Sequence, residues 1–353
     1  MEQTLSKREE QVLFAIIKLY TQHPEPVGSR YLCKKFGFNL SPATIRNTMS
    51  DLEDKGYLKH PHTSAGRIPT EEGYRYFVND LLKNLTVHPP KFIRKKDIEM
   101  FLEIKERDTL LSEISSLLSH LSKYIGIVIA PKHSELIFKH IKFIQLNNNN
   151  ILGIFVSKSG MVFNTIINEK EHISQQQLDK MAHLSNKLFE GKSIQDIKNN
   201  FNSNLNDTTL KNNELLNNDL FKKAYLLTNK AFSIKKDRNI YIDGRGNILN
   251  EPSVTTNFEE IKSIIDTFDN KTRLLKLIDD CLKYDNSPQV LIGIENEDIK
   301  IKHMSMVLSS YNMGDHVKGL LGVVGPMRMY YGRAISTVEY IATIMNYIFM
   351  DEI

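Results

Sequence analysis

Thr44, Arg46, Asn47 and Ser50 are polar side chains spaced to share one face of a helix. Arg and Asn can form bidentate hydrogen bonds with base edges in a DNA major groove, whereas Ser and Thr suit phosphates. The same four residues would also fit the solvated face of an ordinary helical hairpin, so the surrounding sequence must decide. The opposite face of this expected helix is apolar and carries Ile45, Met49 and Leu52.

A second group of polar side chains follows Gly56. Residues 57–60 and 67–69 have strand patterns around a turn-rich stretch, which predicts a hairpin whose basic side chains reach phosphates or a minor groove. The hairpin carries Lys59, His60, His62, Ser64 and Arg67. His60 and His62 could be half of a metal site, but no third ligand stands at a suitable spacing. We therefore expect no metal.

Capping signals define the helices that must position these groups. Ser6 and Glu9 form a capping box for a helix from about 6 to 20, and Ser29 is a candidate N-cap for a short helix that stops at Gly37. The helix with Arg46 has the clearest start, with Ser41 as N-cap and Pro42 at the first helical position, and it stops at Gly56. Thr70 caps a further helix with Glu71 and Glu72 in its first turn. Three helices followed by a hairpin predict a winged helix-turn-helix.

Charge is concentrated at the front of the 353-residue chain. Residues 1–96 contain 16 Lys and Arg against 10 Asp and Glu, a net of +6, and the remainder contains 30 against 32. This distribution indicates that the front meets a polyanion. No apolar run approaches the ~18 residues of a membrane span, and the N-terminus has no secretory pattern, so we expect a cytoplasmic protein. Cys33 and Cys281 lie far apart and suit two reduced thiols.

The rest of the chain alternates between sheet and helix patterns. Pro89 and Pro90 precede a basic linker to residue 96, and a helical pattern covers 97–124. The expected strands are 124–130, 137–146, 151–167 with a turn at Ser159-Gly160, 290–295, 304–311 and 320–324. The segment 174–234 is helical, polar and Asn-rich, with Phe201–Leu216 as a loop or weak helix, and helices are expected at 257–284 and 334–350. This order predicts an α+β domain interrupted by an insertion.

Ordered motifs at both ends of the chain closely resemble the heat-inducible transcription repressor family HrcA. They are Pro26–Arg30, Ser41–Met49, Leu52–Glu53, Gly56–Leu58, His62–Thr70 and Gly73–Arg75 at the front, and Ile292–Gly293, Glu295–Asn296, Tyr311, Gly322–Met329, Tyr331 and Arg333 at the back. The segment Asp243–Leu249 is a looser match to a Gly-rich turn of the family. The chain departs from the family pattern at Met327 and Tyr330, where Thr and Asp are more usual.

The resemblance implies an α+β fold with an N-terminal winged helix-turn-helix followed by a GAF-like α+β domain with an inserted dimerising domain. We expect the winged helix and linker at 1–96, the GAF-like domain at 97–170 and 256–353, and the inserted domain at 171–255. The resemblance also implies a homodimer that binds an inverted-repeat operator (CIRCE-type) in double-stranded DNA before chaperone operons, supported by the GroEL chaperonin and inactivated by heat stress. The expected DNA contacts are Ser29, Arg30, Ser41, Thr44, Arg46, Asn47, Ser50, His62, Ser64 and Arg67.

Two other functions remain open at this stage. A small-molecule effector could act through the GAF-like domain, or the DNA-binding segment could be an appendage of an enzyme. The Gly-rich run 319–325 lacks the elements of a phosphate-binding loop and reads as a buried strand before a Pro turn. Arg328 and Arg333 suit pairing with acidic groups at a domain interface, in a purely structural role. We find no nucleophile, carboxylate-pair or metal pattern, and we expect neither catalysis nor a cofactor.

Overall fold

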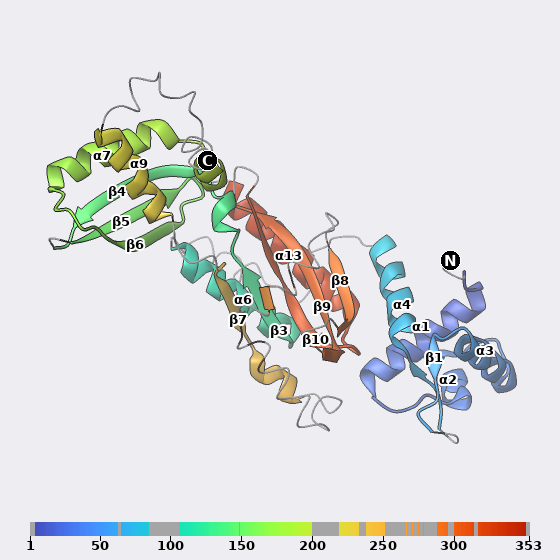
Figure 1. Ribbon diagram of the computed structural model, residues 1–353. Helices are drawn as coiled ribbons and strands as arrows, with labels where there is room; N and C mark the ends of the chain where they lie inside the picture. Colours follow the sequence, from blue (N-terminus) through green and yellow to red (C-terminus); the bar gives the residue numbers. More distant parts are fainter. Residues whose placement is uncertain are drawn as a thin grey trace.

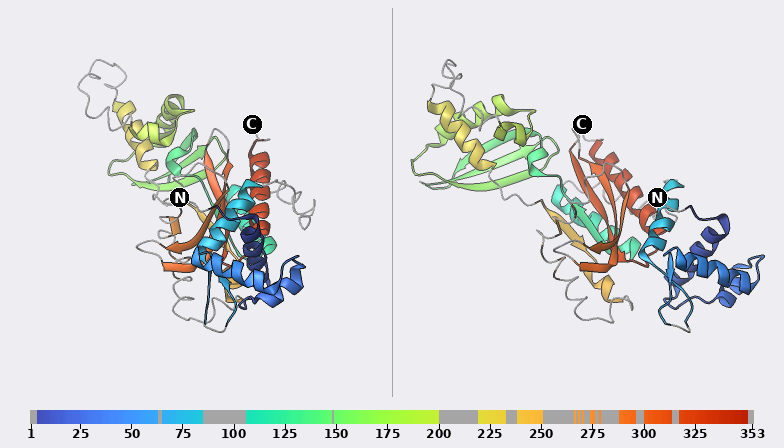
Figure 2. Two further views of the ribbon diagram at one scale, coloured as in Figure 1. Left: turned by 90° about the vertical axis from the view of Figure 1, so that its right-hand side faces the viewer. Right: turned by 45° about the vertical axis from the view of Figure 1, so that its right-hand side comes forward.

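The chain forms three parts that lie in a row (Figures 1 and 2). The structure is a computed structural model and describes residues 4–62, 65–84, 106–147, 149–199, 219–232, 238–250, 288–295, 300–313 and 317–350, with residues 266, 268, 270, 274, 275 and 278. The N-terminal part and a small helix-covered sheet lie at opposite ends, and a larger sheet lies between them. The expected linker at 89–96, Phe201–Leu216 and most of the expected helix 257–284 are outside the described residues.

The N-terminal part contains four helices and a short hairpin. Its elements are α1 (Lys7–Gln22), α2 (Ser29–Phe36), α3 (Pro42–Asp54), β1 (Leu58–Lys59), β2 (Ile68–Pro69) and α4 (Glu71–Lys83). The capping box of α1 is confirmed, because the Ser6 side chain accepts from the Glu9 N–H and the Glu9 carboxylate accepts from the Ser6 N–H. The order of elements expected from the sequence is thus present.

The central part is built on one antiparallel sheet with the strand order β7-β3-β10-β9-β8. Its strands are β3 (Ile125–Ile129), β7 (Ile240–Asp243), β8 (Gln289–Glu295), β9 (Lys300–Asn312) and β10 (Lys318–Pro326), and its helices are α6 (Arg107–Ser122) and α13 (Tyr331–Met350). Short helical segments also occur at η1 (His133–Glu135), at η3 (Arg245–Asn250) and at residues 194–199, which form a short helix.

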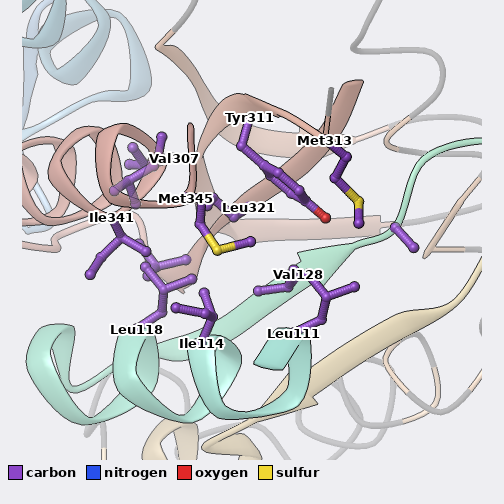
Figure 3. Packing of buried hydrophobic residues seen from close by; sticks show 14 of the residues in the cluster. Leu111, Ile114, Leu118, Val128, Val307, Tyr311, Met313, Leu321, Ile341 and Met345 are labelled. Carbon is purple, nitrogen blue, oxygen red and sulfur yellow. The ribbon is translucent and has the colours of Figure 1, made fainter. Parts of the chain in front are cut away.

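Both faces of the central sheet are buried. Helices α6 and α13 pack on one face, where Leu118 and Ile341 meet Val128 and Leu321 in a continuous apolar layer (Figure 3). On the other face, Ile125, Ile127 and Ile129 pack with Phe268 and Leu274. The alternation of side chains along β3 therefore supplies a core on each side, which explains why the whole strand is apolar.

The Gly-rich run 319–325 forms β10 in the middle of this sheet. A Cβ at Gly319 would lie 2.3 Å from the Tyr311 ring, and one at Gly322 would lie 2.1 Å from the Val307 carbonyl oxygen. These glycines therefore permit close packing within the sheet, and the expectation of a buried strand before a Pro turn is confirmed.

The third part is a separate antiparallel sheet with the strand order β4-β5-β6. It consists of β4 (Phe138–Gln145), β5 (Asn150–Ser157), β6 (Val162–Asn168), α7 (Gln175–Phe189) and α9 (Asp219–Ala231). The two helices cover one face of the sheet (Figure 1). The core between them is aromatic, with Phe138 and Phe155 stacked at 5.7 Å and Phe232 edge-on to both rings.

The expected boundaries at 170 and 255 do not match this strand pairing. β4, β5 and β6 were expected in the interrupted domain, but they pair only with one another and pack under α7 and α9. β7 was expected in the insertion, but it pairs with β3 of the central sheet. Strands that are adjacent in sequence usually pair, so the sequence pattern favours placing β3 beside β4. The observed pairing of β3 with β7 joins residues that are far apart in the chain, and it has no signature in the local sequence.

Candidate nucleic-acid interface

Helix α3 presents the predicted polar face. The Ser41 hydroxyl accepts from the Thr44 N–H at 3.0 Å, and Pro42 occupies the first turn, as predicted. Arg46, Asn47 and Ser50 are exposed, and Thr44 is partly buried, with its hydroxyl 2.9 Å from that of Ser41. The opposite face is buried and consists of Ile45, Thr48, Met49 and Leu52. One face of α3 therefore packs in the core of the N-terminal part, and the opposite face is accessible to solvent.

The start of α2 differs from the prediction. Gly28 is the N-cap and Ser29 is the first helical residue, so Ser29 does not make the expected cap hydrogen bond. The predicted and observed helix starts differ by one residue, and residue types alone do not determine which of the two neighbours is the N-cap. The predicted stop is confirmed, because Gly37 caps the C-terminus in a left-handed conformation with φ +60°. Arg30 is exposed in the first turn of α2, next to the half-exposed Tyr31.

The hairpin is fixed to the segment before α2. Leu58 pairs with Pro69, and Val27 and Arg67 exchange two backbone hydrogen bonds of 2.9 Å. A Cβ at Gly66 would lie 2.4 Å from the Val27 backbone, so only glycine allows this approach. The hairpin therefore has a defined position relative to α2 and α3.

Arg67 points to α3 and is mostly buried. Its guanidinium is 2.7 Å from the Glu53 carboxylate, and its side chain is 14% exposed. His60 Nδ1 lies 2.7 Å from the other Glu53 oxygen. Glu53 thus joins both strands of the hairpin to the end of α3, and Arg67 is less accessible to a phosphate than the sequence suggested. Sequence reasoning missed Glu53, whose only signal was its place in the Leu52–Glu53 motif.

Other hairpin residues remain accessible. Lys59 and His62 are exposed. Ser64, like its neighbour Thr63, lies outside the described residues, so its expected contact stays a prediction. The hairpin therefore offers Lys59 and His62 to a partner, while His60 and Arg67 hold its shape.

An ion pair ties the end of α3 to the start of α1. The Lys55 ammonium lies 2.6 Å from the Glu9 carboxylate, which also closes the capping box of α1. The hydrogen bond from Lys55 holds the pKa of Glu9 below its ordinary value. Glu9 was predicted only as a cap, because the partner 46 residues away has no local signature. The pair braces the helix that carries Arg46.

The N-terminal part contacts the central part through α4. The Arg75 guanidinium donates to the Ile292 carbonyl at 2.6 Å, and Gly293, at φ +65°, lies so close to Glu71 that a Cβ would be 2.4 Å from its carboxylate. Arg328 donates to the Thr21 carbonyl at 3.4 Å, which places it at the expected domain interface. Arg333 instead donates to the Leu121 carbonyl at 2.6 Å, between α13 and α6 of the central part.

No group of three or more potential metal ligands occurs within the described ranges. In the same ranges, no helix is long and apolar enough to cross a membrane. His60 lies beside the Glu53 carboxylate and points to the end of α3, where Arg67 completes an ion-pair cluster. The accessible groups on α2, α3 and the hairpin thus include the hydrogen-bond donors and cations Arg30, Arg46, Asn47, Ser50, Lys59 and His62, and α3 also exposes Asp51 and Asp54 near its C-terminus.

Comparisons with known proteins point to one family. Residues 108–335 match the family described as HrcA protein C terminal domain. The chain is 36% identical over 345 residues to a heat-inducible transcription repressor of Syntrophobacter fumaroxidans, with 97% of both chains covered. It is also 36% identical over 344 residues to the repressor of the same name from Geobacter sulfurreducens, again with 97% of both chains covered. A solved chain described as a hypothetical protein shares the fold, with a TM-score of 0.63, 21% identity and 99% coverage of both chains.

Proposed function

This chain belongs to the HrcA family of heat-inducible transcription repressors, and from that premise we propose that it represses heat-shock genes by binding their operators. The observation that carries the proposal is the two-sided character of α3. Its Ile45 face is buried in the domain, and its Arg46 and Asn47 side chains are exposed on the other side.

In the proposed function, residues 4–84 are a winged helix-turn-helix, in which α3 enters the major groove and the β1–β2 hairpin is the wing. Arg46 and Asn47 then contact base edges, because their side chains can form paired hydrogen bonds with guanine and adenine. Phosphates are contacted from α2, from the N-terminus and the exposed face of α3, and from the wing. We add Lys59 to the predicted phosphate contacts, and we propose that Arg67 supports the wing instead of binding a phosphate. The proposed phosphate contacts are thus Ser29, Arg30, Ser41, Thr44, Ser50, Lys59, His62 and Ser64.

The operator is proposed to be an inverted repeat of the CIRCE type, bound by a homodimer. A two-fold DNA site is matched most simply by one winged helix per half-site. The protein then acts in the cytoplasm, and its role is binding and not catalysis.

The surface proposed for dimerisation is the uncovered face of the β4-β5-β6 sheet, here called the open face. Cross-strand pairing places its apolar side chains in register, and they are Ile144, Leu152, Ile154, Val156, Val162 and Ile166. Val162 is 61% exposed and Ile166 is 66% exposed, on the side opposite α7 and α9. Exposed apolar patches of this kind mark protein interfaces, and a second copy of the same face would cover it.

Strand pairing supports a revised set of domain limits. We propose a DNA-binding domain at 4–84, a GAF-like domain at 106–130 and 239–350, and an inserted dimerising domain at 137–232. The chain then crosses between the last two domains at 130–137 and at 232–240, and the DNA-binding domains lie at the far ends of the dimer from the open face.

A footprint on the chromosomal region before a chaperonin operon tests this function. The full-length protein is expected to protect two half-sites related by a two-fold axis, and a matched fragment with one half-site scrambled should be protected only at much higher protein concentration. Equal protection of unrelated DNA would contradict operator binding.

A further inference from the structure

A cavity of about 360 Å³ lies where the inserted β4-β5-β6 unit joins the central part. It is lined by Lys132 and His133 of the first crossing and by Phe232 and Arg238, which flank the second crossing. Ile194 and Lys198 of the short helix 194–199 complete one side, and Leu275 reaches it from the segment that covers the central sheet. Both connections between the two units therefore border one space.

The inner wall of the cavity is aromatic. Phe155 and Phe163 stack with ring centroids 5.6 Å apart, and Phe232 meets Phe155 edge-on at 5.3 Å. The His133 ring stands edge-on to Phe163 at 4.6 Å. These rings are nearly buried, with Phe163 8%, Phe232 3% and Phe155 1% exposed, so the core beneath α7 and α9 fixes them and a small part of each ring borders the cavity as a preformed apolar wall.

The polar lining is cationic. Lys132 is exposed, and Lys198 and Arg238 are half-buried; Lys198 donates to the Phe232 carbonyl at 3.0 Å. Among the described lining residues there is no Asp or Glu. An apolar wall beside three cations fits a ligand that has an apolar body and an anionic end.

We propose that this cavity binds a small organic anion, with an aromatic or aliphatic body against Phe155, Phe163 and Phe232 and a carboxylate or phosphate near Lys132 and Arg238. Ligand binding at this cavity is independent of DNA binding, whereas its consequence for the spacing of the DNA-binding domains rests on the proposed function. Such a ligand would touch both crossings at once and favour the relative orientation of the two units that it fits best. It would thereby restrict how far apart two DNA-binding domains can lie in a dimer.

Calorimetric titration of the full-length protein with 2-naphthoate tests the proposal. We expect saturable binding with a dissociation constant on the order of 0.1–1 mM, and binding of the neutral analogue 2-naphthamide at least about tenfold weaker. Lys132→Met combined with Arg238→Met should weaken naphthoate binding about tenfold. Lys139→Met, which removes an exposed cation on β4 outside the lining, is the matched control and should bind like the unmodified protein.

Ser134→Trp provides a second test, because it adds volume to the lining without removing a cation. It should reduce naphthoate binding at least about tenfold, while the thermal unfolding midpoint shows that the fold is retained. Equal binding of naphthoate and naphthamide, or unchanged binding in both lining variants, would overturn the proposal. Loss of binding in Ile166→Asp but not in Ser134→Trp would place the ligand on the open face and overturn it as well.

Discussion

Glu53 shows how one carboxylate can determine the geometry of the β1–β2 hairpin. It accepts Arg67 and His60 at 2.7 Å each, from the two sides of the hairpin, while it stands at the end of α3. The position of the hairpin relative to the exposed Arg46 and Asn47 therefore depends on this residue. Arg67, which the sequence predicts as a phosphate contact, pairs with Glu53 and has a side chain that is 14% exposed.

Replacing Arg67 with Ala is expected to lower the free energy of unfolding of the N-terminal domain by about 1–3 kcal/mol, because Glu53 loses a charged hydrogen bond in a partly buried site. Thermal unfolding measures the loss. Lys59→Ala is the control, since it removes an exposed cation from the same hairpin and should leave the unfolding midpoint unchanged. It should instead weaken operator and random DNA alike and reduce the salt slope by about one charge. If Arg67→Ala keeps full stability and shows that reduced slope, Arg67 is a phosphate contact.

The roles of residues whose hydrogen-bond partners are near in sequence could be predicted, whereas the roles of residues with distant partners could not. Ser41 and Pro42 predict the start of α3 because an N-cap side chain bonds to a backbone N–H within three residues. The capping box of α1 is predictable for the same reason. The Glu9–Lys55 and Glu53–Arg67 pairs join residues far apart in sequence, so spacing does not reveal them.

At the scale of elements, β-strand alternation shows which surface is left uncovered. Along β5 the buried residues Ile151 and Phe155 face α7 and α9, and the intervening Leu152 and Ile154 lie on the open face. The sequence predicts these strands from their composition, but the pairing that separates β4 from β3 is long-range. Element type was therefore predictable here and sheet membership was not.

Ile166→Asp is expected to convert a dimer into a monomer, because a charge at a 66% exposed position would be buried at the proposed contact between two copies. Sedimentation velocity measures the change, and operator affinity should fall with it. Leu226→Asp is the matched control, since Leu226 is 46% exposed on α9, on the covered side of the sheet. A dimeric Ile166→Asp, or a monomeric unmodified protein that protects both half-sites tightly, would contradict the assignment.

At the scale of the whole molecule, the N-terminal part joins the central part through α4 and α1, by hydrogen bonds and by a buried contact between two tyrosine rings. Arg75 binds the Ile292 carbonyl and Arg328 binds the Thr21 carbonyl, beside the packed rings of Tyr74 and Tyr331. Interfaces between domains of one chain commonly open at lower free energy than the core within a domain. Heat is therefore expected to act through partial unfolding, with the chaperonin GroEL restoring the active form.

Brief heating of the purified protein is expected to reduce operator binding, and addition of GroEL with ATP should restore it. Gel-shift titration before heating, after heating and after chaperonin treatment measures the effect, with heated protein and ATP alone as the control. Full activity after heating without chaperonin, combined with release of DNA by a small molecule alone, would favour the effector hypothesis.

The most direct test of the central claim is the ratio of operator affinity to random-DNA affinity for Arg46→Ala and Asn47→Ala, with Arg8→Ala on α1 as the control. Arg8 is exposed in the same domain and outside α3, so its removal changes charge without changing the reading face. Each α3 variant is expected to lose about 1–3 kcal/mol of operator preference, while Arg8→Ala keeps the ratio of the unmodified protein. Equal losses on operator and random DNA for Arg46→Ala and Asn47→Ala would show that α3 does not read the bases.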